Sequence, residues 1–500
     1  MQLAEIVREL GVAKVEGPLL RQVAGLTYDS RRVTPGMVFV AVPGLNVDGH
    51  DYIATAVERG ASAVICERNG FIPHRATKIK VPDSREALAR AAATFYEHPS
   101  TGLKVIGITG TNGKTTVAFM LRQILEQAGA RTGLVSTIHY EIGERVIPAN
   151  RTTPEALEIQ QMLAAMVRAR CHACVMEVSS HALDQKRVVG VEFDAAVFTN
   201  LTEDHLDYHQ NLEAYYAAKK SLFGQMQTSA KKGASVINID DAFGGRLAGE
   251  TSPEVQLTYG LGEAARLRAS SLRLGRDFTE MIIEGPDVRF ECRLPLIGRH
   301  NVYNALAAIG AALALKVPHA AIETALRTLS PVPGRLERIN QGQPFGLFVD
   351  YAHTPEALRQ MLVTLREFTP GRLLLAFGCG GSRDLAKRGR MGRVAAELGD
   401  LVLITSDNPR RESSQAIAEQ VQDGYRSVRA EGCTVELDRR EAIDQLIRSA
   451  RPGDTVLIAG KGHETYQEFE DTVIPFDDRV CARESLDALG FRSPPEAGET

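Results

Sequence analysis

Residues 104–116 read KVIGITGTNGKTT, an apolar run that leads directly into a glycine-rich turn. The run predicts a buried strand, and the apolar spacing after Lys114 predicts a helix. Glycines allow such a loop to approach phosphate closely, and the amides at the helix N-terminus favour an anion. Strict P-loop spacing is not met, because Ile108 stands where the first glycine is expected. The context still predicts a nucleotide site in which Lys114 reaches the β- and γ-phosphates and the Thr115 hydroxyl binds Mg²⁺.

Strand and helix patterns alternate on both sides of this loop. Such alternation predicts βαβ units in a mostly parallel sheet, with the ligand site at the carboxyl ends of the strands. The expected strands are 104–109, 173–178, 195–199, 235–239, 347–350, 372–377 and 401–405, and the expected helices are 115–128, 212–223, 302–315, 355–368 and 388–398.

Turn-rich segments divide the chain into three blocks. The segments HPSTG at 98–102 and PVPG at 331–334 are typical linkers. At roughly 150 residues per domain, 500 residues fit three domains. We predict an α/β fold with a central, P-loop-type domain over 99–330. A small N-terminal α/β domain over 1–98 and a Rossmann-like C-terminal α/β domain over 331–500 flank it, and the tail at 493–498 is expected to fray.

The composition argues against several classes of protein. The formal net charge is −4, whereas nucleic-acid binders usually carry a basic excess. No apolar run approaches the roughly 18 residues of a membrane span, and the first ten residues predict an amphipathic helix instead of a signal peptide. Seven scattered cysteines are typical of a reducing cytoplasm. Cys171 and Cys174 lack a second ligand pair for zinc, so we expect two buried thiols in a cytoplasmic, monomeric protein that binds small molecules.

Nine further motifs follow one another along nearly the whole chain. They are DSRRVTPG from Asp29, TTPE from Thr152, EVSSHALDQKRV from Glu177, TNLTEDHLDYH from Thr199, HNVYNALAA from His300, PGRLE from Pro333, VDYAHTPEAL from Val349, DNPR from Asp407 and AGKGHETYQ from Ala459. Together with GTNGKTT, this ordered set resembles the Mur ligases. The loop alone is also similar to that of folylpolyglutamate synthetases, which should lack the DSR block and DNPR.

The resemblance implies an ATP-dependent enzyme that forms an amide bond. It implies addition of meso-2,6-diaminopimelate to the D-Glu carboxylate of UDP-N-acetylmuramoyl-L-alanyl-D-glutamate through an acyl phosphate. The products would be the UDP-MurNAc-tripeptide of peptidoglycan synthesis, ADP and phosphate. Addition of lysine on the same scaffold is the near alternative, and a regulatory nucleotide-binding module without ligase chemistry is an alternative of another class. The three blocks would bind UDP-MurNAc, ATP and the amino acid, in chain order.

By the same resemblance, Thr115, Glu177 and His205 bind Mg²⁺, and Lys219 is carbamylated by CO₂ to N6-carboxylysine that holds a second Mg²⁺. Glu177, His205 and Lys219 join Lys114 as the expected catalytic residues. Without the resemblance, the Glu203-Asp204-His205 run is typical of a solvated loop, and Lys219 of a surface lysine. Carbamylation requires a neutral amine, so we expect a depressed pKa for Lys219. Lys220 is adjacent, and the Ala-Ala-Lys alignment favours Lys219.

The resemblance also implies the nucleotide ligands. Hydroxyl, amide and guanidinium groups suit carbonyl, carboxylate and pyrophosphate oxygens. One of the residues implied as an ATP ligand, Asp350, has an alternative role, because it could cap the helix that follows it. The expected ATP ligands are Gly110, Thr111, Asn112, Gly113, Lys114, Thr115, Thr116, His300, Asn301, Arg335 and Asp350. The expected UDP-MurNAc-dipeptide ligands are Ser30, Thr152, Thr153, Ser179, Gln185 and Arg187.

Arg410 carries the prediction of which amino acid is added. meso-Diaminopimelate differs from lysine by one carboxylate, and a bidentate arginine pair recognises a carboxylate strongly. In the family, DNPR marks the diaminopimelate-adding members, and Glu464 would face the distal ammonium. Ser382, next to Arg383, stands where many members of the family have Asp, so the departure affects a neighbour of Arg383 and not Arg383 itself. The expected amino-acid ligands are Arg383, Asp407, Asn408, Pro409, Arg410, Gly460 and Glu464.

Overall fold

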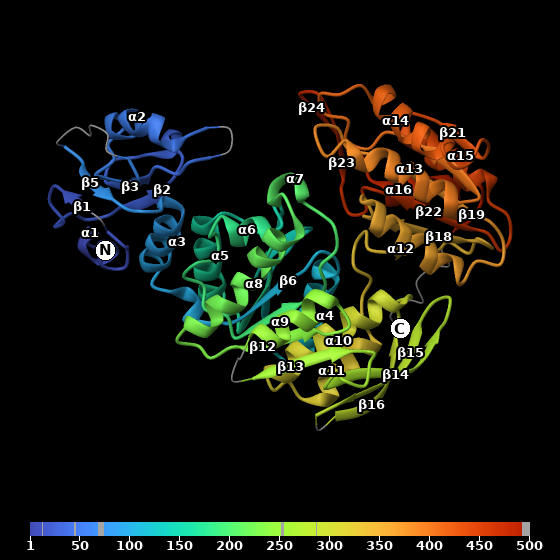
Figure 1. Cartoon of the computed structure of the whole chain (residues 1–500), viewed down its shortest axis with the longest axis horizontal. Coiled ribbons are helices and arrows are strands. Elements are labelled where there is room, and N and C mark those ends of the chain that lie inside the picture. The colour runs from blue at the N-terminus through green and yellow to red at the C-terminus, as the bar shows by residue number, and fades with distance from the viewer. Residues whose placement is uncertain (13, 45–46, 69–74, 252–254, 287, 493–500) are drawn as a thin grey trace.

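The computed structural model describes residues 1–500 apart from 13, 45–46, 69–74, 252–254, 287 and 493–500. The tail that we expected to fray therefore lies outside the described residues. The chain forms three lobes in sequence order, each built on its own sheet (Figure 1). The expected α/β fold with mostly parallel sheets is confirmed.

The N-terminal lobe holds a five-stranded sheet in the order β1-β5-β4-β3-β2. β2 to β5 run parallel and β1 pairs antiparallel with β5. The amphipathic start of the chain forms α1, in which Leu3 and Ile6 are buried. The elements are α1 (Leu3–Arg8), β1 (Lys14–Glu16), β2 (Gly25–Thr27), β3 (Met37–Val40), α2 (Ile53–Glu58), β4 (Ala63–Cys66), β5 (Thr77–Lys80) and α3 (Ser84–Phe95).

The central lobe is built around β6, the strand that precedes the glycine-rich turn. β6 lies between β10 and β11 and runs parallel to both, so these three strands end at one edge of the sheet. The order is β16-β15-β14-β13-β12-β11-β6-β10-β7-β8-β9. Its elements include β6 (Lys104–Thr109), α4 (Lys114–Gln127), β7 (Thr132–Val135), β8 (His139–Ile142), β9 (Arg145–Pro148), α5 (Ala156–Arg168), β10 (Ala173–Glu177), β11 (Ala195–Phe198), α7 (Leu206–His209), α8 (Leu212–Thr228), β12 (Ala234–Asn238), β13 (Gln256–Gly260), α10 (Arg299–Ala314) and α11 (His319–Arg327).

One part of the central sheet departs from the expected alternation of strand and helix. β14 (Leu267–Leu274), β15 (Thr279–Gly285) and β16 (Val288–Leu294) form an antiparallel meander. Along β16 the side chains alternate between buried and exposed, because one face packs on the helical layer and the other faces solvent. This alternation with a period of two residues is the feature of the sequence from which an antiparallel strand could have been predicted.

The C-terminal lobe holds a sheet in the order β17-β18-β22-β19-β20-β21, parallel except for the edge strand β17. α12 to α14 cover one face, and α15 and α16 cover the other. A hairpin of β23 and β24 follows β22. The elements are β17 (Glu337–Arg338), β18 (Gly346–Asp350), α12 (Pro355–Arg366), β19 (Leu373–Phe377), α13 (Ala386–Leu398), β20 (Leu401–Ile404), α14 (Ser414–Arg426), β21 (Cys433–Val435), α15 (Arg439–Ser449), β22 (Thr455–Ala459), β23 (Tyr466–Phe469), β24 (Thr472–Pro475) and α16 (Asp478–Ala488).

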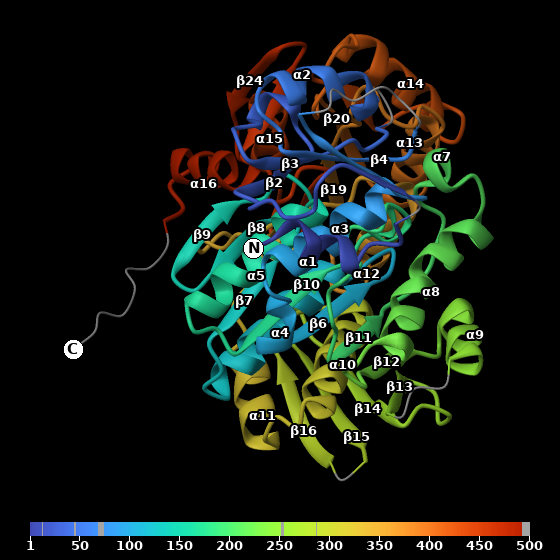
Figure 2. The ribbon, with the colours of Figure 1, turned by 90° about the vertical axis from the view of Figure 1, so that its left-hand side faces the viewer.

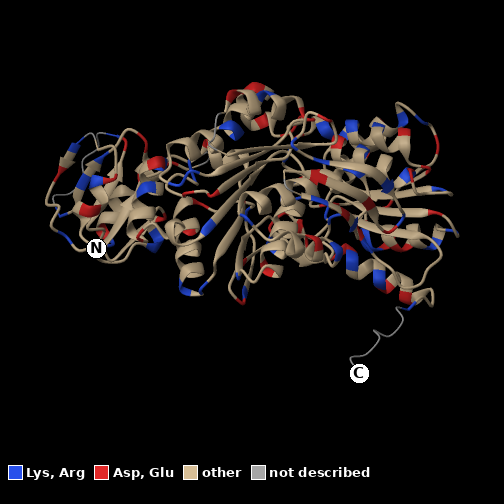
Figure 3. Ribbon diagram, turned by 90° about the horizontal axis from the view of Figure 1, so that it is seen from below, with Lys and Arg blue, Asp and Glu red and all other residues tan. Residues whose placement is uncertain are grey.

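The lobes join in two different ways (Figures 1 and 2). The N-terminal lobe shares an apolar core with α5, where Ala156 and Leu157 pack with residues of α3. The C-terminal lobe meets the central lobe through polar contacts such as Arg390 with Glu203 at 3.4 Å, and Ile297, which lies between β16 and α10, adds an apolar contact with the C-terminal core. Acidic and basic residues are interspersed along the ribbon of all three lobes (Figure 3). Among the described residues, no helix is both long enough and apolar enough to cross a membrane.

Candidate active site

Gly110 and Gly113 give the phosphate loop its shape. Their φ angles are +148° and +87°, and a side chain at Gly113 would meet the Oδ1 atom of Asn304 at 2.3 Å. The Asn112 amide donates to the Asn200 side chain at 2.9 Å, which ties the loop to the segment after β11. The loop amides are therefore held at the N-terminus of α4, the arrangement that suits an anion.

Lys114 folds over this loop. Its Nζ donates to the carbonyls of Gly110 at 2.9 Å and Thr111 at 2.8 Å. Burial lowers the pKa of Lys114, and the charges of Glu177 and Asp204 act in the opposite direction. Two neutral carbonyls are weaker partners for an ammonium than a phosphate, so the side chain is available to a nucleotide.

Glu177 ends β10 fully buried. Its carboxylate accepts hydrogen bonds from the Thr115 hydroxyl at 3.0 Å, the Thr137 amide at 2.8 Å and the Thr137 hydroxyl at 3.0 Å. Arg335 of the C-terminal lobe donates to the same Thr115 oxygen at 3.0 Å. The first turn of α4 is thus one of the places where the central and C-terminal lobes meet.

Lys219 is a buried amine, 1% exposed, and not the surface lysine that its sequence context alone suggests. Its Nζ donates to the Gly110 carbonyl at 2.8 Å and lies 4.3 Å from the centre of the Tyr215 ring. Burial, and then the charge of Lys114, lower the pKa of Lys219 well below its usual range. Lys220 instead pairs with Glu250 at 2.9 Å. The neutral amine that carbamylation requires is therefore favoured at Lys219.

His205 also lies near the Tyr215 ring. Its imidazole centre lies 6.1 Å from that of Tyr215 and 4.8 Å from that of His181. Burial lowers the pKa of His205 and outweighs the opposite effect of Asp204. A neutral imidazole is the form that can bind a metal ion.

The Thr115 and Glu177 oxygens fit Mg²⁺. They are adjacent hard oxygen donors, and among the described residues no cationic side chain forms an ion pair with the buried Glu177 carboxylate. Across that part of the chain, no three His, Cys, Asp or Glu side chains gather closely enough to hold an ion alone. Phosphate oxygens and water usually supply further ligands of a protein-bound Mg²⁺.

A cavity of about 750 Å³ connects these groups with the predicted adenine and ribose side. It is lined by Lys114, Thr115, Glu177, His205, His300, Asn301, Arg335 and Asp350, among others. Asn301 donates to the Ile297 carbonyl at 2.9 Å and accepts from Asn304 at 3.0 Å, which holds Asn304 against the phosphate loop. Burial lowers the pKa of His300 to about 4, and its buried Nδ1 lacks a partner among the described residues.

Asp350 ends β18 at this cavity. Its carboxylate accepts from the Leu336 amide at 2.6 Å and the Ala352 amide at 2.8 Å. Burial raises the pKa of Asp350, and the charge of Arg335 acts against this. Thr354 caps α12, so the alternative that Asp350 caps this helix is wrong. Asp350 joins two loops instead, and each carboxylate oxygen can accept further hydrogen bonds.

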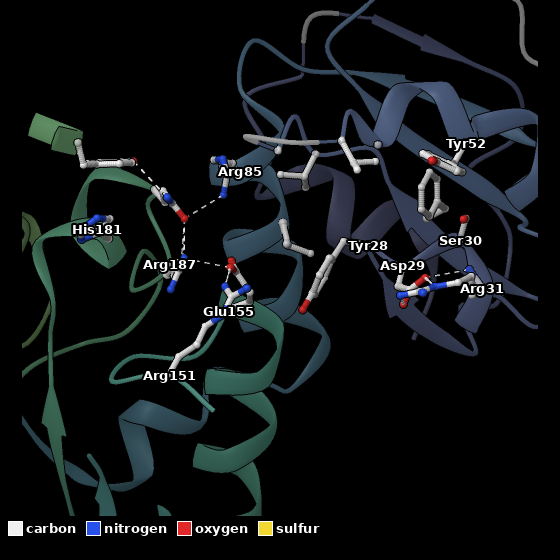
Figure 4. Close-up of a pocket in the computed structure, with 18 of the residues that line it drawn as sticks. Tyr28, Asp29, Ser30, Arg31, Tyr52, Arg85, Arg151, Glu155, His181 and Arg187 are labelled. Atoms are coloured by element: carbon white, nitrogen blue, oxygen red, sulfur yellow. Dashed lines mark hydrogen bonds and ion pairs between the residues drawn. The ribbon is translucent and has the colours of Figure 1, made fainter. Parts of the chain in front are cut away.

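A second cavity of about 1000 Å³ lies between the N-terminal and central lobes (Figure 4). Of the predicted UDP-MurNAc-dipeptide ligands, Ser30, Gln185 and Arg187 line it. Thr152 lines the nucleotide cavity instead. Thr153 donates to the Glu177 carbonyl at 2.8 Å and accepts from the Ser179 amide at 3.0 Å. Thr153 and Ser179 therefore fix the end of β10 between the two cavities.

A third group lies at the carboxyl ends of β20 and β22. Asn408 donates to Glu464 at 2.8 Å, and the fully buried Lys461 donates to both, at 3.0 Å and 2.8 Å. A side chain at Gly460 would meet the Asp407 carboxylate at 2.8 Å, so these two positions are also adjacent.

Arg410 lies beside this group but already has partners. Its Nε donates to Glu468 of β23 at 2.9 Å and its Nη1 to the Gly381 carbonyl at 2.9 Å. Its backbone amide donates to the Glu468 carbonyl at 3.0 Å, which joins the segment after Pro409 to the hairpin. Arg383 is exposed and lines the cavity between the N-terminal and central lobes.

Three family models match the chain in order: Mur ligase family, catalytic domain, over residues 22–96; Mur ligase middle domain, over 108–312; and Mur ligase, glutamate ligase domain, over 334–462. The chain is a Mur ligase. It therefore belongs to a family of ATP-dependent ligases that form amide bonds.

Curated relatives match this Mur ligase over almost its whole length. The UDP-N-acetylmuramoyl-L-alanyl-D-glutamate–2,6-diaminopimelate ligase of Syntrophomonas wolfei is 43% identical, covering 97% of this chain and 99% of the relative. The enzyme of the same name from Gloeobacter violaceus is 44% identical, covering 97% and 98%. A solved structure of a ligase of that name is 32% identical, covers 98% of this chain and 99% of its own, and has a TM-score of 0.71.

Most of the predicted site residues of this Mur ligase lie in the nucleotide cavity, in the cavity between the N-terminal and central lobes, or at the ends of β20 and β22. Lys114, Thr115, Glu177, His205 and Arg335 share one cavity, whereas Arg383 lies apart from the Asn408 and Glu464 group. Sequence reasoning missed Thr137, Lys461 and Glu468 as partners of predicted residues. Thr137 follows a short parallel strand, and Lys461 lies inside AGKGHETYQ, so both carried a signal. It also missed Arg85, which joins the lobes by donating to Pro43 and Gln185.

Proposed function

We propose that this Mur ligase joins meso-2,6-diaminopimelate to the D-Glu carboxylate of UDP-N-acetylmuramoyl-L-alanyl-D-glutamate, with conversion of ATP to ADP and phosphate. The product is the UDP-MurNAc-tripeptide of peptidoglycan synthesis. The observation that carries the reaction type is the hydrogen bond from Arg335 to Thr115, because it brings the C-terminal lobe to the phosphate loop. The name that the curated relatives share supports the choice of substrates.

The chemistry runs in two steps. A carboxylate oxygen of the dipeptide attacks the γ-phosphorus of ATP, an O–P bond forms, and the bond to the β-phosphate oxygen breaks to release ADP. The amine of the amino acid then attacks the acyl carbon, a C–N bond forms, phosphate leaves, and the nitrogen gives a proton to solvent. Lys114 and Arg335 would stabilise the negative charge that the first step concentrates.

The metal site would consist of Thr115, Glu177, His205 and a carbamylated Lys219. Bound Mg²⁺ would supply charge neutralisation between the phosphoryl group and the carboxylate. The burial of the Lys219 amine, which lowers its pKa, and its contact with the Gly110 carbonyl support carbamylation at this position. His300, Asn301 and Asp350 would bind the adenosine part, and Ser30, Gln185 and Arg187 the UDP-MurNAc part.

The amino acid would bind at the ends of β20 and β22. Glu464 would face the distal ammonium, and Arg410 would donate to the second carboxylate through the nitrogen edge that Glu468 leaves open. Asp407, Pro409 and Gly460 shape this subsite. Arg383 would reach it only through movement of the exposed 382–385 segment. We also propose a cytoplasmic, monomeric enzyme with a role in cell-wall growth and division.

The test is incubation with the UDP-dipeptide, ATP and a panel of diamino acids, with the product identified by mass. We expect rapid tripeptide formation with meso-diaminopimelate. Preferred addition of lysine would replace the proposed substrate by the alternative one. Isotopic oxygen placed in the dipeptide carboxylate should appear in the released phosphate, and its absence there would exclude an acyl phosphate.

A further inference from the structure

Glu468 pairs with the Arg410 guanidinium beside the nitrogen edge that the proposed amino-acid subsite would offer to a carboxylate. Its Oε2 accepts from the Arg410 Nε at 2.9 Å, and the Gly381 carbonyl accepts from Nη1. Both side chains of the pair are partly exposed, at 22% for Arg410 and 34% for Glu468. The pair is therefore formed at the surface of the subsite, where a ligand can compete with it.

Two backbone hydrogen bonds hold Glu468 beside the DNPR segment. The Glu468 amide donates to the Asn408 Oδ1 at 3.1 Å, and the Arg410 amide donates to the Glu468 carbonyl. The backbone of β23 is thus joined to the DNPR segment independently of the Glu468 carboxylate. Replacing that carboxylate removes a charge from the subsite and leaves these backbone hydrogen bonds in place.

We infer that Glu468 is a specificity-determining residue that weakens the selection of diaminopimelate over diamino acids without a second carboxylate. The inference rests on the proposed role of Arg410. When the second carboxylate of diaminopimelate binds Arg410, it meets the like charge of Glu468, which opposes binding. When lysine binds, Glu468 keeps Arg410 paired, so the penalty of a partly buried arginine without a counter-charge is avoided.

The two effects change the selectivity for diaminopimelate over lysine in the same direction. Removing the Glu468 charge relieves the repulsion in the diaminopimelate complex and leaves Arg410 without a counter-charge in the lysine complex. Both changes raise the ratio of kcat/KM for diaminopimelate to kcat/KM for lysine. A residue that merely positioned Arg410 for the substrate would produce the opposite change, because its loss would raise the KM for diaminopimelate.

The experiment measures kcat/KM for both amino acids in the wild type, Glu468→Gln and Glu470→Gln. Glu470 lies on the same hairpin with an exposed side chain, and its amide donates to the Arg410 carbonyl. Glu470→Gln therefore removes a nearby charge without touching the guanidinium. We expect Glu468→Gln to raise the selectivity ratio roughly tenfold, mainly through a lower KM for diaminopimelate, with unchanged KM for ATP. Glu470→Gln should leave the ratio within about twofold of wild type.

A double-mutant cycle separates the failure of the inference from that of the proposed function. In an Arg410→Ala background, Glu468→Gln should no longer change the ratio, because the effect acts through the guanidinium. An unchanged or lower ratio in the Glu468→Gln single variant overturns the inference. A ratio that still rises without Arg410 also overturns it. A wild type that adds neither amino acid instead overturns the proposed function, and an unaltered ratio on Arg410→Ala overturns the role of Arg410.

Discussion

At the scale of single residues, Arg410 separates recognition of the amino acid from recognition of the nucleotide. Replacing Arg410 by lysine keeps the charge but removes the planar fork that can hold a carboxylate. We expect the KM for diaminopimelate to rise roughly tenfold or more, since losing a charge-assisted hydrogen bond costs about 1.5–3 kcal/mol. Steady-state kinetics with each substrate varied in turn checks this. Equal increases in the KM for ATP and for diaminopimelate would contradict the assignment.

Lys219 gives a second prediction, which depends on pH. Its pKa is lowered in the folded protein by burial, so the neutral amine persists at pH values where an exposed lysine is protonated. The carbamate should therefore form near neutral pH and be lost as the pH falls through the folded-state pKa. Isotopically labelled bicarbonate should give a carbamate signal in magnetic resonance spectra. Lys219→Ala should abolish both this signal and turnover.

The adjacent Lys220 is the matched control for that experiment. Its ammonium pairs with Glu250 near the surface, away from Gly110. Lys220→Ala should retain the carbamate signal and near-normal turnover. A signal that disappeared with Lys220 and remained without Lys219 would reverse the assignment.

At the scale of elements, helices α15 and α16 support the strand ends that carry the amino-acid subsite. Arg439 and Asp478 form a fully buried ion pair at 2.7 Å, and Arg439 also donates to the carbonyls of Ser406 and Ala459. Arg439→Ala should lower the free energy of unfolding by about 3–5 kcal/mol, because it leaves Asp478 buried without a partner. Urea unfolding measures this.

The same two helices carry the control pair. Arg440 and Glu484 pair on their exposed side, where each side chain is 54% exposed. Arg440→Ala should cost no more than about 1 kcal/mol. A similar loss for both variants would show that burial does not determine the contribution of the Arg439 pair.

The elements also show how far the sequence alone reaches. β6, α4 and the glycine-rich turn were predictable because they combine an apolar run, two glycines and a helical period in one continuous segment. The packing of Lys219 against Tyr215 was not, because one turn of a helix cannot show which side the rest of the chain covers. The pairing of Arg410 with Glu468 was equally hidden, since it depends on how a hairpin folds back across DNPR.

At the scale of the whole molecule, the N-terminal lobe depends on α5 of the central lobe for part of its core. Leu157 is 4% exposed within the cluster that includes Leu88 of α3. Leu157→Ala should lower the free energy of unfolding by about 2–5 kcal/mol. Hydrogen exchange should show faster opening of α3 together with α5, since the two share one apolar contact surface.

Val167 on the same helix provides the comparison, because it is 40% exposed. Val167→Ala should change the free energy of unfolding by no more than about 0.5 kcal/mol and leave the exchange of α3 unaltered. If Leu157→Ala accelerated exchange in α5 alone, the two lobes would be independent folding units.

The shared core around α5 bears on how this chain can be recombined with its relatives. A chimera that exchanged residues 1–98 would bring a foreign α3 against the Ala156 and Leu157 face, and its fit would depend on matching methyl groups across the junction. A chimera that exchanged residues 331–500 would face polar contacts such as Arg390 with Glu203, which tolerate mismatch by taking up water. It would also have to accommodate Ile297, which packs in the C-terminal core. Amino-acid preference should therefore be easier to transplant between such enzymes than recognition of the nucleotide-sugar.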